Sequence, residues 1–452
     1  MFLVLMEIVL RMDWLCLKCV SLLVLINLSN THPQNLETVD FLSEVVSDDQ
    51  GEFDNLMMFE IKCISNECSV QDRREFYQDQ KCKMLKDFKH HSHVLCDPDM
   101  SNTHEKLAIK QIKPSKLKVR RHKRAALFRP DPMDMRDFLD PQTYHRFAII
   151  KSYIEELSSR HKFVSTINLG ETAEGRAILG VKIGHSKFGE ETPSVLIDGG
   201  MHAREWITVA TALQIIGRLV KVFKSVSDSS CGNVLSSIDW YIVPVLNPDG
   251  YEFSHESDRL WRKNRRPAPE GSTCEGVDLN RNFEIGYGLG ADTNPCSEVY
   301  KGTHEHSEPE TLAIVQLGTQ LNTSLLYYIS LHAYGQSWLT PWGYKTGAVE
   351  NMKELETVAK NAFNEIICNY GKEVPSREYE VGGAADIYYT AGGASDDWVY
   401  EKTGTRFAYT IELPDDGREY GFLLPAEDAP QVAEDIWVAL RSLAFQTVAR
   451  TL

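Results

Sequence analysis

The sequence predicts an α/β fold in which a mixed, largely parallel central β-sheet is flanked by helices. From about residue 140 onward, apolar strand candidates alternate with long helical patterns, which is typical of a sheet covered by helices. The 452 residues are 42% hydrophobic, enough for a sizeable core. They include 48 Lys+Arg and 64 Asp+Glu, a net charge of −16, and this acidic balance argues against nucleic acid as a partner.

The elements of this domain can be placed one after another. Asp140 and Pro141 supply a helix N-cap and a first-turn proline, and apolar residues from Phe147 to Leu157 then recur at helical spacing. Short apolar runs predict buried strands, and longer amphipathic patterns predict the helices between them. The predicted strands are 195–197, 240–246, 325–331 and 407–411, and the later helices are 207–223, 310–321, 352–370 and 431–448.

Residues 1–30 are predicted to be a secretory signal peptide. The strongest apolar run, 19–26, follows Lys18, precedes a mostly polar stretch, and is too short to span a bilayer. A signal anchor that begins at Met1 is the alternative, because charged residues interrupt a longer apolar stretch there. No later segment has the ~18 uninterrupted apolar residues that a spanning helix needs. We therefore expect a secreted protein without a stable membrane span.

Residues 31–124 are predicted to be a pro-segment. Its end, Arg121-His-Lys-Arg124, resembles the sites that secretory processing proteases cut, although a solvated basic linker has the same composition. Because the site lies behind the signal and directly before a change in composition, we expect cleavage after Arg124. Four close cysteines in a secreted chain suggest two disulfides, and their spacing fits no usual zinc pattern. Sequence leaves open the pairing of Cys63, Cys68, Cys82 and Cys96, and likewise that of Cys231 and Cys368.

Two histidines and a glutamate are candidates for a metal site. His202 and Glu205 are three residues apart directly after a predicted strand, so one turn could bring both to one cation. His332 ends another predicted strand, and sites in α/β proteins form at such strand ends. Two histidines and one carboxylate leave a fourth position for water, as in a catalytic zinc site. Each residue alone also has an ordinary structural explanation, so further motifs must decide.

Those motifs are present. From about residue 140 to 447 the chain resembles the zinc metallocarboxypeptidases of the A/B type. Any one of the matching segments is a modest signal, but in this order and at these intervals they are highly specific. The segments are Glu174-Gly-Arg-Ala-Ile, Gly200-Met-His-Ala-Arg-Glu-Trp206, Asn247-Pro-Asp-Gly-Tyr251, Arg259-Leu-Trp-Arg262, Asp278-Leu-Asn-Arg-Asn282, Ser330-Leu-His-Ala-Tyr334, Gly392-Gly393 through Asp397-Trp398, and Tyr409-Thr-Ile-Glu-Leu413.

The resemblance implies a secreted exopeptidase that hydrolyses the C-terminal peptide bond, with a catalytic domain at 125–452 and a core at about 140–447. It implies one Zn²⁺ per catalytic domain, bound by His202, Glu205 and His332. Glu412 would be the general base that acts on the zinc-activated water. Arg262 would stabilise the charge that develops on the carbonyl oxygen, and Asp278 would orient a ligating histidine.

The resemblance also implies how substrate binds. Asn280 and Arg281 match the pair that holds a free C-terminal carboxylate, which a guanidinium binds with two parallel hydrogen bonds. Three further residues match substrate subsites, and two cysteines match a family disulfide that closes the loop around Arg281. The subsite residues are Arg204, Arg259 and Tyr334, and the cysteines are Cys274 and Cys296.

The substrate-capping tyrosine depends on how the loop is counted. Counting from Gly392-Gly393 points to Tyr388, whereas counting back from Trp398 points to Tyr389, because the loop between them is one residue longer than usual. We predict Tyr388.

The same insertion affects the predicted side-chain preference. The count from Trp398 places Asp396 at the floor of the specificity pocket, where a buried carboxylate favours C-terminal Lys or Arg. The other count places Ser395 there. Gly383 supports a basic preference and Gly343 opposes it, so a basic preference is only slightly favoured over an apolar one.

Other functions remain to be weighed. A catalytically inactive, carboxypeptidase-like secreted binding protein needs neither Glu412 nor Arg262, and an endopeptidase or amidase needs no carboxylate clamp at Asn280 and Arg281. We therefore expect a monomeric enzyme that acts on peptides or proteins with a free C-terminus and is processed by a protease at Arg124. Residues 31–124 do not visibly match the usual activation domain, so an inhibitory role for them is a hypothesis based on position.

Overall fold

The computed structural model describes residues 57–63, 73, 76, 82–87, 91–96, 107–111, 139–186, 192–225, 234–370 and 379–448. All of them belong to one compact unit, Asn55–Leu452. The predicted signal peptide, the processing site at Arg124, Cys68 and Cys231 lie outside the described residues.

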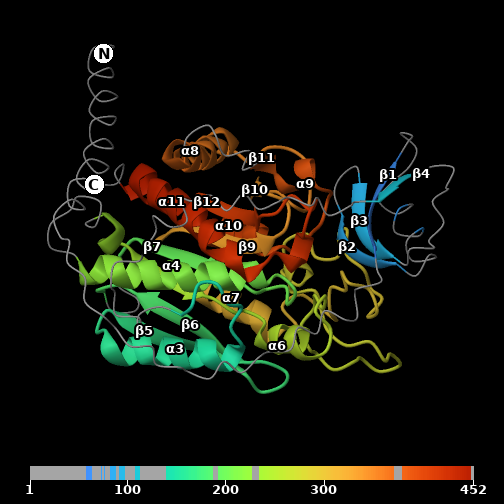
Figure 1. The fold of residues 1–452 in the computed structure, drawn as a ribbon, viewed down its shortest axis with the longest axis horizontal. Coiled ribbons are helices and arrows are strands. Elements are labelled where there is room, and N and C mark those ends of the chain that lie inside the picture. Colours follow the sequence, from blue (N-terminus) through green and yellow to red (C-terminus); the bar gives the residue numbers. More distant parts are fainter. Residues whose placement is uncertain are drawn as a thin grey trace, which may run out of the picture. The chain divides into compact units, whose positions relative to one another are not determined.

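The larger part of this unit is built on an eight-stranded mixed β-sheet (Figure 1). The pairs β10–β11, β12–β9, β9–β7 and β7–β8 are parallel, and the other three are antiparallel. The prediction of a mixed sheet is therefore confirmed. In spatial order the strands are β11 (Glu380–Gly383), β10 (Ser337–Thr340), β12 (Phe407–Leu413), β9 (Leu325–Ala333), β7 (Ser194–Asp198), β8 (Asp239–Val243), β6 (Ala177–Ile183) and β5 (Val164–Glu171).

The central strands are apolar on both faces because helices cover both sides. Every residue of β7, β8 and β12 is buried, as expected for strands inside an α/β sheet. Leu196, Tyr328 and Ala408 join apolar residues of α7 and α10 in one core cluster. Another helix, α4, contacts β8 and β9 and packs on α11, which in turn packs on α8. The helices are α3 (Phe147–Arg160), α4 (Trp206–Lys224), α6 (Pro248–Glu256), α7 (Pro309–Leu321), α8 (Met352–Tyr370), α9 (Ala384–Ile387), α10 (Ser395–Thr403) and α11 (Ala429–Val448).

Helix α3 begins later than the sequence predicted. Asp140 does accept hydrogen bonds from the Gln142 backbone and the Thr143 hydroxyl, but these close an isolated turn. The helix itself starts at Phe147, whose backbone N–H donates to the Glu252 carboxylate on α6. The prediction of a helix starting at Asp140 and Pro141 was therefore wrong, because a side chain from another helix caps this one.

One described helix, α4, is long and apolar enough to cross a membrane, with a mean hydropathy of 1.4. However, 78% of the apolar window is buried inside the protein. Packing against the sheet and α11 accounts for its composition.

A second, smaller sheet is formed by the N-terminal strands β1 (Met57–Cys63), β2 (Lys83–Asp87), β3 (His91–Cys96) and β4 (Leu107–Gln111). They pair antiparallel in the order β2-β3-β1-β4. A disulfide joins Cys82 to Cys96. The small core contains Ile61, Phe76, Val94, Cys96 and Leu107.

Candidate active site

Two candidate ligands come from the turn that joins β7 to α4. Gly200 has a φ of 63°, and a Cβ there would lie 2.8 Å from the Val209 side chain, so only glycine fits this turn. The tight turn places His202 and Glu205 directly before the first residue of α4. Both side chains are only 3% exposed.

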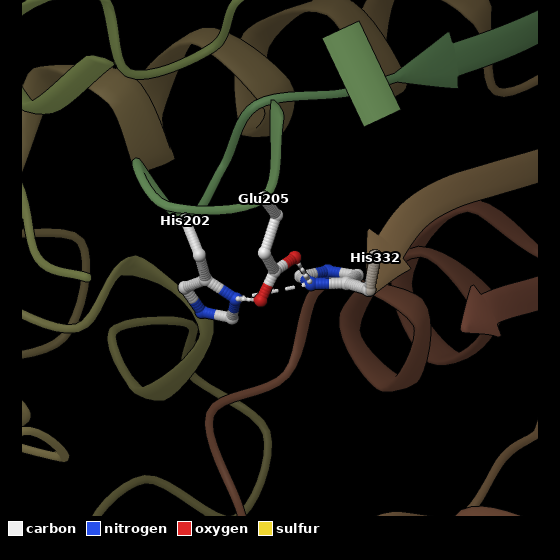
Figure 2. A group of neighbouring side chains, drawn as sticks. All are labelled: His202, Glu205 and His332. Atoms are coloured by element: carbon white, nitrogen blue, oxygen red, sulfur yellow. Dashed lines mark hydrogen bonds and ion pairs between the residues drawn. The ribbon is translucent and has the colours of Figure 1, made fainter. Parts of the chain in front are cut away.

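The third candidate ligand joins them from the end of β9. One ligand atom from each of His202, Glu205 and His332 lies within 4.8 Å of the others (Figure 2). His202 Nδ1 is 2.9 Å from Glu205 Oε1, and His332 Nδ1 is 3.1 Å from Glu205 Oε2. The two Nδ1 atoms are 3.1 Å apart. The structure therefore brings together the three residues that the sequence predicted as a metal site.

A hydrogen bond from Nε2 of His202 to Asp278 orients the ring so that the Nδ1 lone pair faces Glu205 and His332. Its Nε2 lies 3.0 Å from Asp278 Oδ1, and a carboxylate can only accept, so Nε2–H donates and Nδ1 carries the lone pair. Burial, and then the Arg262 guanidinium, lower the pKa of His202 and favour the neutral ring. Buried ring lone pairs and a carboxylate that converge in this way are suited to hold a cation, and two imidazoles with one carboxylate suit Zn²⁺.

The other ring, His332, is oriented by a chain of hydroxyl groups that the sequence analysis missed. Its Nε2 lies 3.0 Å from Ser330 Oγ, which donates to Asp198 Oδ1 at 2.9 Å. The Tyr328 hydroxyl donates to the other oxygen of Asp198 at 2.5 Å. Burial raises the pKa of Asp198 to about 6, against the hydrogen bond from Tyr328. The signal was present in the sequence: residues 328, 330 and 332 alternate along one strand and therefore share a face.

Strand register brings Glu412 to the metal ligands. Glu412 on β12 pairs with His332 on the parallel strand β9. One of its carboxylate oxygens, Oε2, is buried and has no hydrogen-bond partner among the described residues. The other, Oε1, lies 2.5 Å from Lys86 Nζ of the small N-terminal sheet. The residue predicted as the general base therefore stands beside the metal group.

Arg262 also faces this space. Its guanidinium donates two hydrogen bonds to Asp278 Oδ2, at 2.9 and 3.1 Å, and its Nη1 lies 3.9 Å from Glu205 Oε1. Burial alone would raise the pKa of Asp278, but Arg262, Arg281 and His202 hold it well below its usual range. One carboxylate thus positions both a ligating histidine and the arginine.

The metal group and Glu412 line one cavity, and the predicted carboxylate clamp, Asn280 and Arg281, lines it too. The tyrosine that contacts Arg281 is Tyr389 and not the predicted Tyr388. Arg281 Nη2 donates to the hydroxyl of Tyr389 at 3.2 Å, and its Nε has no hydrogen-bond partner among the described residues. Tyr388 is buried, and its hydroxyl pairs with Ser337 Oγ at 2.7 Å. A Cβ at Gly393 would lie 2.3 Å from the Arg281 carbonyl oxygen, so this glycine is required by close packing.

Asp396, which was predicted at the floor of the specificity pocket, is among the residues that line the cavity, and its side chain is buried. Burial raises its pKa, against a hydrogen bond from Thr410. The neighbouring Asp397 accepts hydrogen bonds from the backbone N–H groups of Gly343 and Tyr344. Ser395, the alternative candidate, is not among the residues that line the cavity. Five other residues that line the cavity are small or apolar: Leu339, Gly343, Ala384, Ala391 and Ala394.

Of the three predicted subsite residues, Arg204 lines the cavity, whereas Arg259 and Tyr334 do not. Arg204 lines the cavity, is fully buried, and donates to Glu298 at 3.0 Å. Arg259 stacks on the Trp206 ring at 3.5 Å and donates to the backbone of Arg204. Tyr334 is fully buried and packs against Phe422. Neither Arg259 nor Tyr334 is among the residues that line the cavity.

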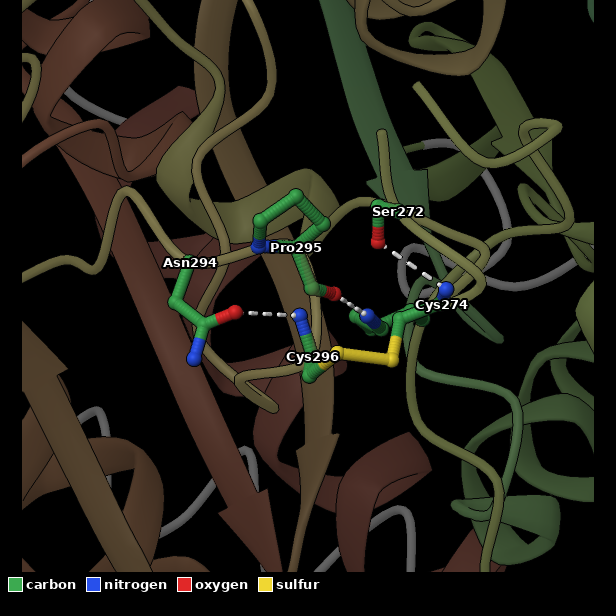
Figure 3. The surroundings of a disulfide bond; sticks show 6 residues. Ser272, Cys274, Asn294, Pro295 and Cys296 are labelled. Atoms are coloured by element: carbon green, nitrogen blue, oxygen red, sulfur yellow. Dashed lines mark hydrogen bonds between the residues drawn. A yellow bond between two sulfur atoms is a disulfide. The ribbon is translucent and has the colours of Figure 1, made fainter. Parts of the chain in front are cut away.

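The predicted disulfide between Cys274 and Cys296 is present (Figure 3). The backbone N–H of Cys274 donates to Ser272, and that of Cys296 donates to Asn294, each at 3.0 Å. The bridge closes the loop that contains Asn280 and Arg281, as expected.

Comparison with known proteins establishes the class to which this fold and site belong. Residues 150–439 match the zinc carboxypeptidases. The chain therefore belongs to the zinc carboxypeptidase family, and the resemblance noted in its motifs is confirmed. It is a metallocarboxypeptidase, a hydrolase whose cofactor is zinc, and the buried His-Glu-His group is the one that could hold it.

The chain is similar to both A-type and B-type relatives. Carboxypeptidase A5 from Macaca fascicularis is 39% identical over 308 residues, which cover 68% of each protein. Carboxypeptidase B from Astacus astacus is 32% identical over 308 residues, which cover 68% of this chain and 97% of that protein. The crystal structure of carboxypeptidase A from Helicoverpa armigera has a TM-score of 0.72 and 25% identity, covering 88% of this chain and 98% of that one.

Removing the hydroxyl that orients His332 should weaken zinc binding. In Ser330→Ala, His332 loses its Nε2 hydrogen-bond acceptor, and we expect the zinc dissociation constant to rise about tenfold or more. Competition with a chromogenic chelator measures this constant independently of activity. Ser324→Ala, a serine just before β9 that bonds Ser194, is the matched control. An unchanged zinc affinity in Ser330→Ala would contradict the positioning role.

Proposed function

We propose that this chain is the zymogen of a secreted carboxypeptidase that removes C-terminal Lys or Arg residues from peptides and proteins. The observation that carries the proposal is a single cavity lined by the metal group, the base Glu412, the clamp residues Asn280 and Arg281, and the acidic floor at Asp396. A zinc carboxypeptidase needs a metal, a base, a group that binds the free C-terminal carboxylate and a pocket for the last side chain.

In this proposal each residue has a defined task. When bound, Zn²⁺ supplies a Lewis acid that polarises the scissile carbonyl and makes water acidic enough to attack at neutral pH. Glu412 accepts the proton of the attacking water and returns it to the leaving amine. Arg262 stabilises the negative charge that develops on the carbonyl oxygen. Asn280 and Arg281 bind the terminal carboxylate and so restrict cleavage to the last peptide bond.

The preference for basic side chains rests on Asp396. A carboxylate that is only 3% exposed, in a cavity whose lining includes several small and apolar residues, offers a strong partner to a buried ammonium or guanidinium. A raised pKa is consistent with a site that awaits a cation, because a bound Lys or Arg side chain would stabilise the ionised form.

The capping tyrosine is proposed to be Tyr389, in place of Tyr388. Its hydroxyl already contacts Arg281, and it is less buried than its neighbour. The hydrogen bond between the Tyr388 hydroxyl and Ser337 would have to break before the Tyr388 ring could cover a substrate.

Secretion and processing are supported by the N-terminal segment and by the disulfides. The apolar run at 19–26 and the basic site ending at Arg124 are typical of a secreted precursor. Disulfides at Cys82–Cys96 and Cys274–Cys296 suit an oxidising compartment. We propose that a processing protease cuts after Arg124, and that the released domain acts as a monomer.

Replacing the base should abolish turnover but not metal binding. In Glu412→Gln, with Arg124 cleaved, we expect release of C-terminal residues to fall by about 10²–10⁴-fold. Amino acids released from peptides ending in Lys, Arg, Phe or Leu can be measured by mass spectrometry. Glu380→Gln, on an exposed position of β11, is the matched control. Retention of most of the activity in Glu412→Gln, or activity that persists after a chelator removes the metal, would overturn the mechanism.

Neutralising the pocket floor should remove the basic preference. In Asp396→Asn we expect kcat/KM to fall about 10–100-fold for peptides ending in Arg and to change little for those ending in Leu. In the native enzyme the preference should weaken as pH falls, because the protonated carboxyl no longer pairs with a cation. With a raised pKa, this loss begins above the pH expected for an ordinary Asp, about 3.9. Native enzyme that releases Phe faster than Arg would refute the assignment.

A pair of conservative substitutions separates the two tyrosines. Tyr389→Phe should raise KM several-fold for peptide substrates, since the hydroxyl that contacts Arg281 is lost. Tyr388→Phe should leave KM unchanged, because its hydroxyl bonds Ser337. Steady-state kinetics with one peptide would check both, and the reverse pattern would restore Tyr388 as the capping residue.

A further inference from the structure

The N-terminal strand β2 reaches the catalytic cavity. Leu85, Lys86 and Asp87 all line it, together with the metal group and Glu412. This strand belongs to the segment that precedes the predicted processing site, so the uncleaved chain carries part of its own pro-segment in the active site.

The Lys86 ammonium contacts the general base directly. Its Nζ lies 2.5 Å from Glu412 Oε1, and the two side chains are only 13% and 11% exposed. The ammonium also lies 5.2 Å from the centroid of the Tyr388 ring and 5.8 Å from that of Tyr334, within the range of cation–π attraction. A charge pair in such a shielded place is screened much less by salt than one on the surface.

Residues next to Lys86, on β2 and on the adjacent strand β3, also contact the catalytic domain. The carbonyl oxygen of Leu85 accepts a hydrogen bond from Arg204 Nη2 at 3.0 Å. On the adjacent strand β3, His93 stacks on Tyr334, and its Nδ1 lies 3.2 Å from the Tyr334 hydroxyl.

Side chains at the end of β2 and on β3 are also bonded to one another. The Ser92 hydroxyl donates to Asp87 and accepts from Arg73 Nε at 2.8 Å. Lys86 therefore lies on a strand pair, β2 and β3, that is bonded to the catalytic domain through Arg204 and Tyr334.

We infer that Lys86 is a built-in inhibitor aimed at the general base. This inference rests on the proposed function, in which Glu412 accepts the proton of the attacking water. Oε2 is buried, and while the ammonium occupies the position next to Oε1 the attacking water is displaced from that oxygen, so the uncleaved chain is inhibited at the chemical step. A pro-segment that only covers the cavity would exclude large substrates more than small ones, whereas occupation of the base inhibits hydrolysis of every substrate.

The test uses the full chain kept uncleaved by Arg124→Ala and a small blocked dipeptide with a C-terminal Arg. Lys86→Met removes the charge but keeps most of the length, and we expect it to raise the rate of the uncleaved chain about tenfold or more. Lys86→Arg keeps a cation and should stay inhibited. Lys110→Met, on an exposed position of β4, is the matched control and should change nothing. Mass spectrometry confirms that each chain is intact and that Cys82–Cys96 has formed.

The outcomes separate this inference from the proposed function. Two results would show that the pairing of Lys86 with Glu412 does not inhibit the uncleaved chain. One is an unchanged hydrolysis rate in Lys86→Met, and the other is a rate in Lys86→Arg as high as that in Lys86→Met. When Arg124 is retained and cleaved, the native chain and the Lys86→Met chain should have equal activity, since the strand is then free to leave. Absence of metal-dependent activity in the cleaved native enzyme would overturn the proposed function itself.

Discussion

The convergence of two buried imidazole rings and one buried carboxylate at one end of the β-sheet is the constraint on which the rest of the site depends. The ligand atoms of His202, Glu205 and His332 lie within 4.8 Å of one another, and all three side chains are buried. Such a group is stable only if the ring protons point away and a cation lies between the lone pairs. The surrounding polar network meets the first requirement through Asp278 on one ring and through Ser330 and Asp198 on the other.

The same network links the metal group to the groups proposed to act on substrate. Asp278 accepts from Arg262 as well as from His202, so the proposed oxyanion-stabilising cation is fixed relative to one ligand. Glu412 is fixed relative to another, because it pairs with His332 across two parallel strands. The contact of Lys86 with Glu412 adds a third link, from the N-terminal sheet to the base. A small displacement of β2 would therefore change the hydrogen bonding of the group proposed to take the proton.

Sequence reasoning succeeded where the spacing is local and failed where packing between distant segments decides. His202 and Glu205 share one turn and His332 ends a short apolar run, so these three residues could be proposed as ligands from their positions, whereas Glu412 was predicted from the resemblance to the zinc carboxypeptidases. Asp198 and Ser330 were missed because the alternation of residues 328, 330 and 332 along one strand does not show that Tyr328 and Ser330 share a partner, Asp198, on another strand. The predicted helix start at Asp140 was wrong for a similar reason, since the N–H of Phe147 is bound by Glu252. The choice between Tyr388 and Tyr389 depended on Gly392-Gly393, and these glycines are held by contacts with Gly286 and Arg281.

By itself, the sequence determined the fold class, and through the family resemblance it predicted the zinc ligands, Glu412 as the base and the disulfide around Arg281, because each depends on residue type and on order along one chain. Only the tertiary structure decided which tyrosine contacts Arg281, that Asp396 and not Ser395 lines the cavity, and that Lys86 contacts Glu412. The physical reason is the same in each case. These contacts join side chains far apart in sequence at distances of a few ångströms, and a shift of one residue in strand register or loop length changes which side chain arrives.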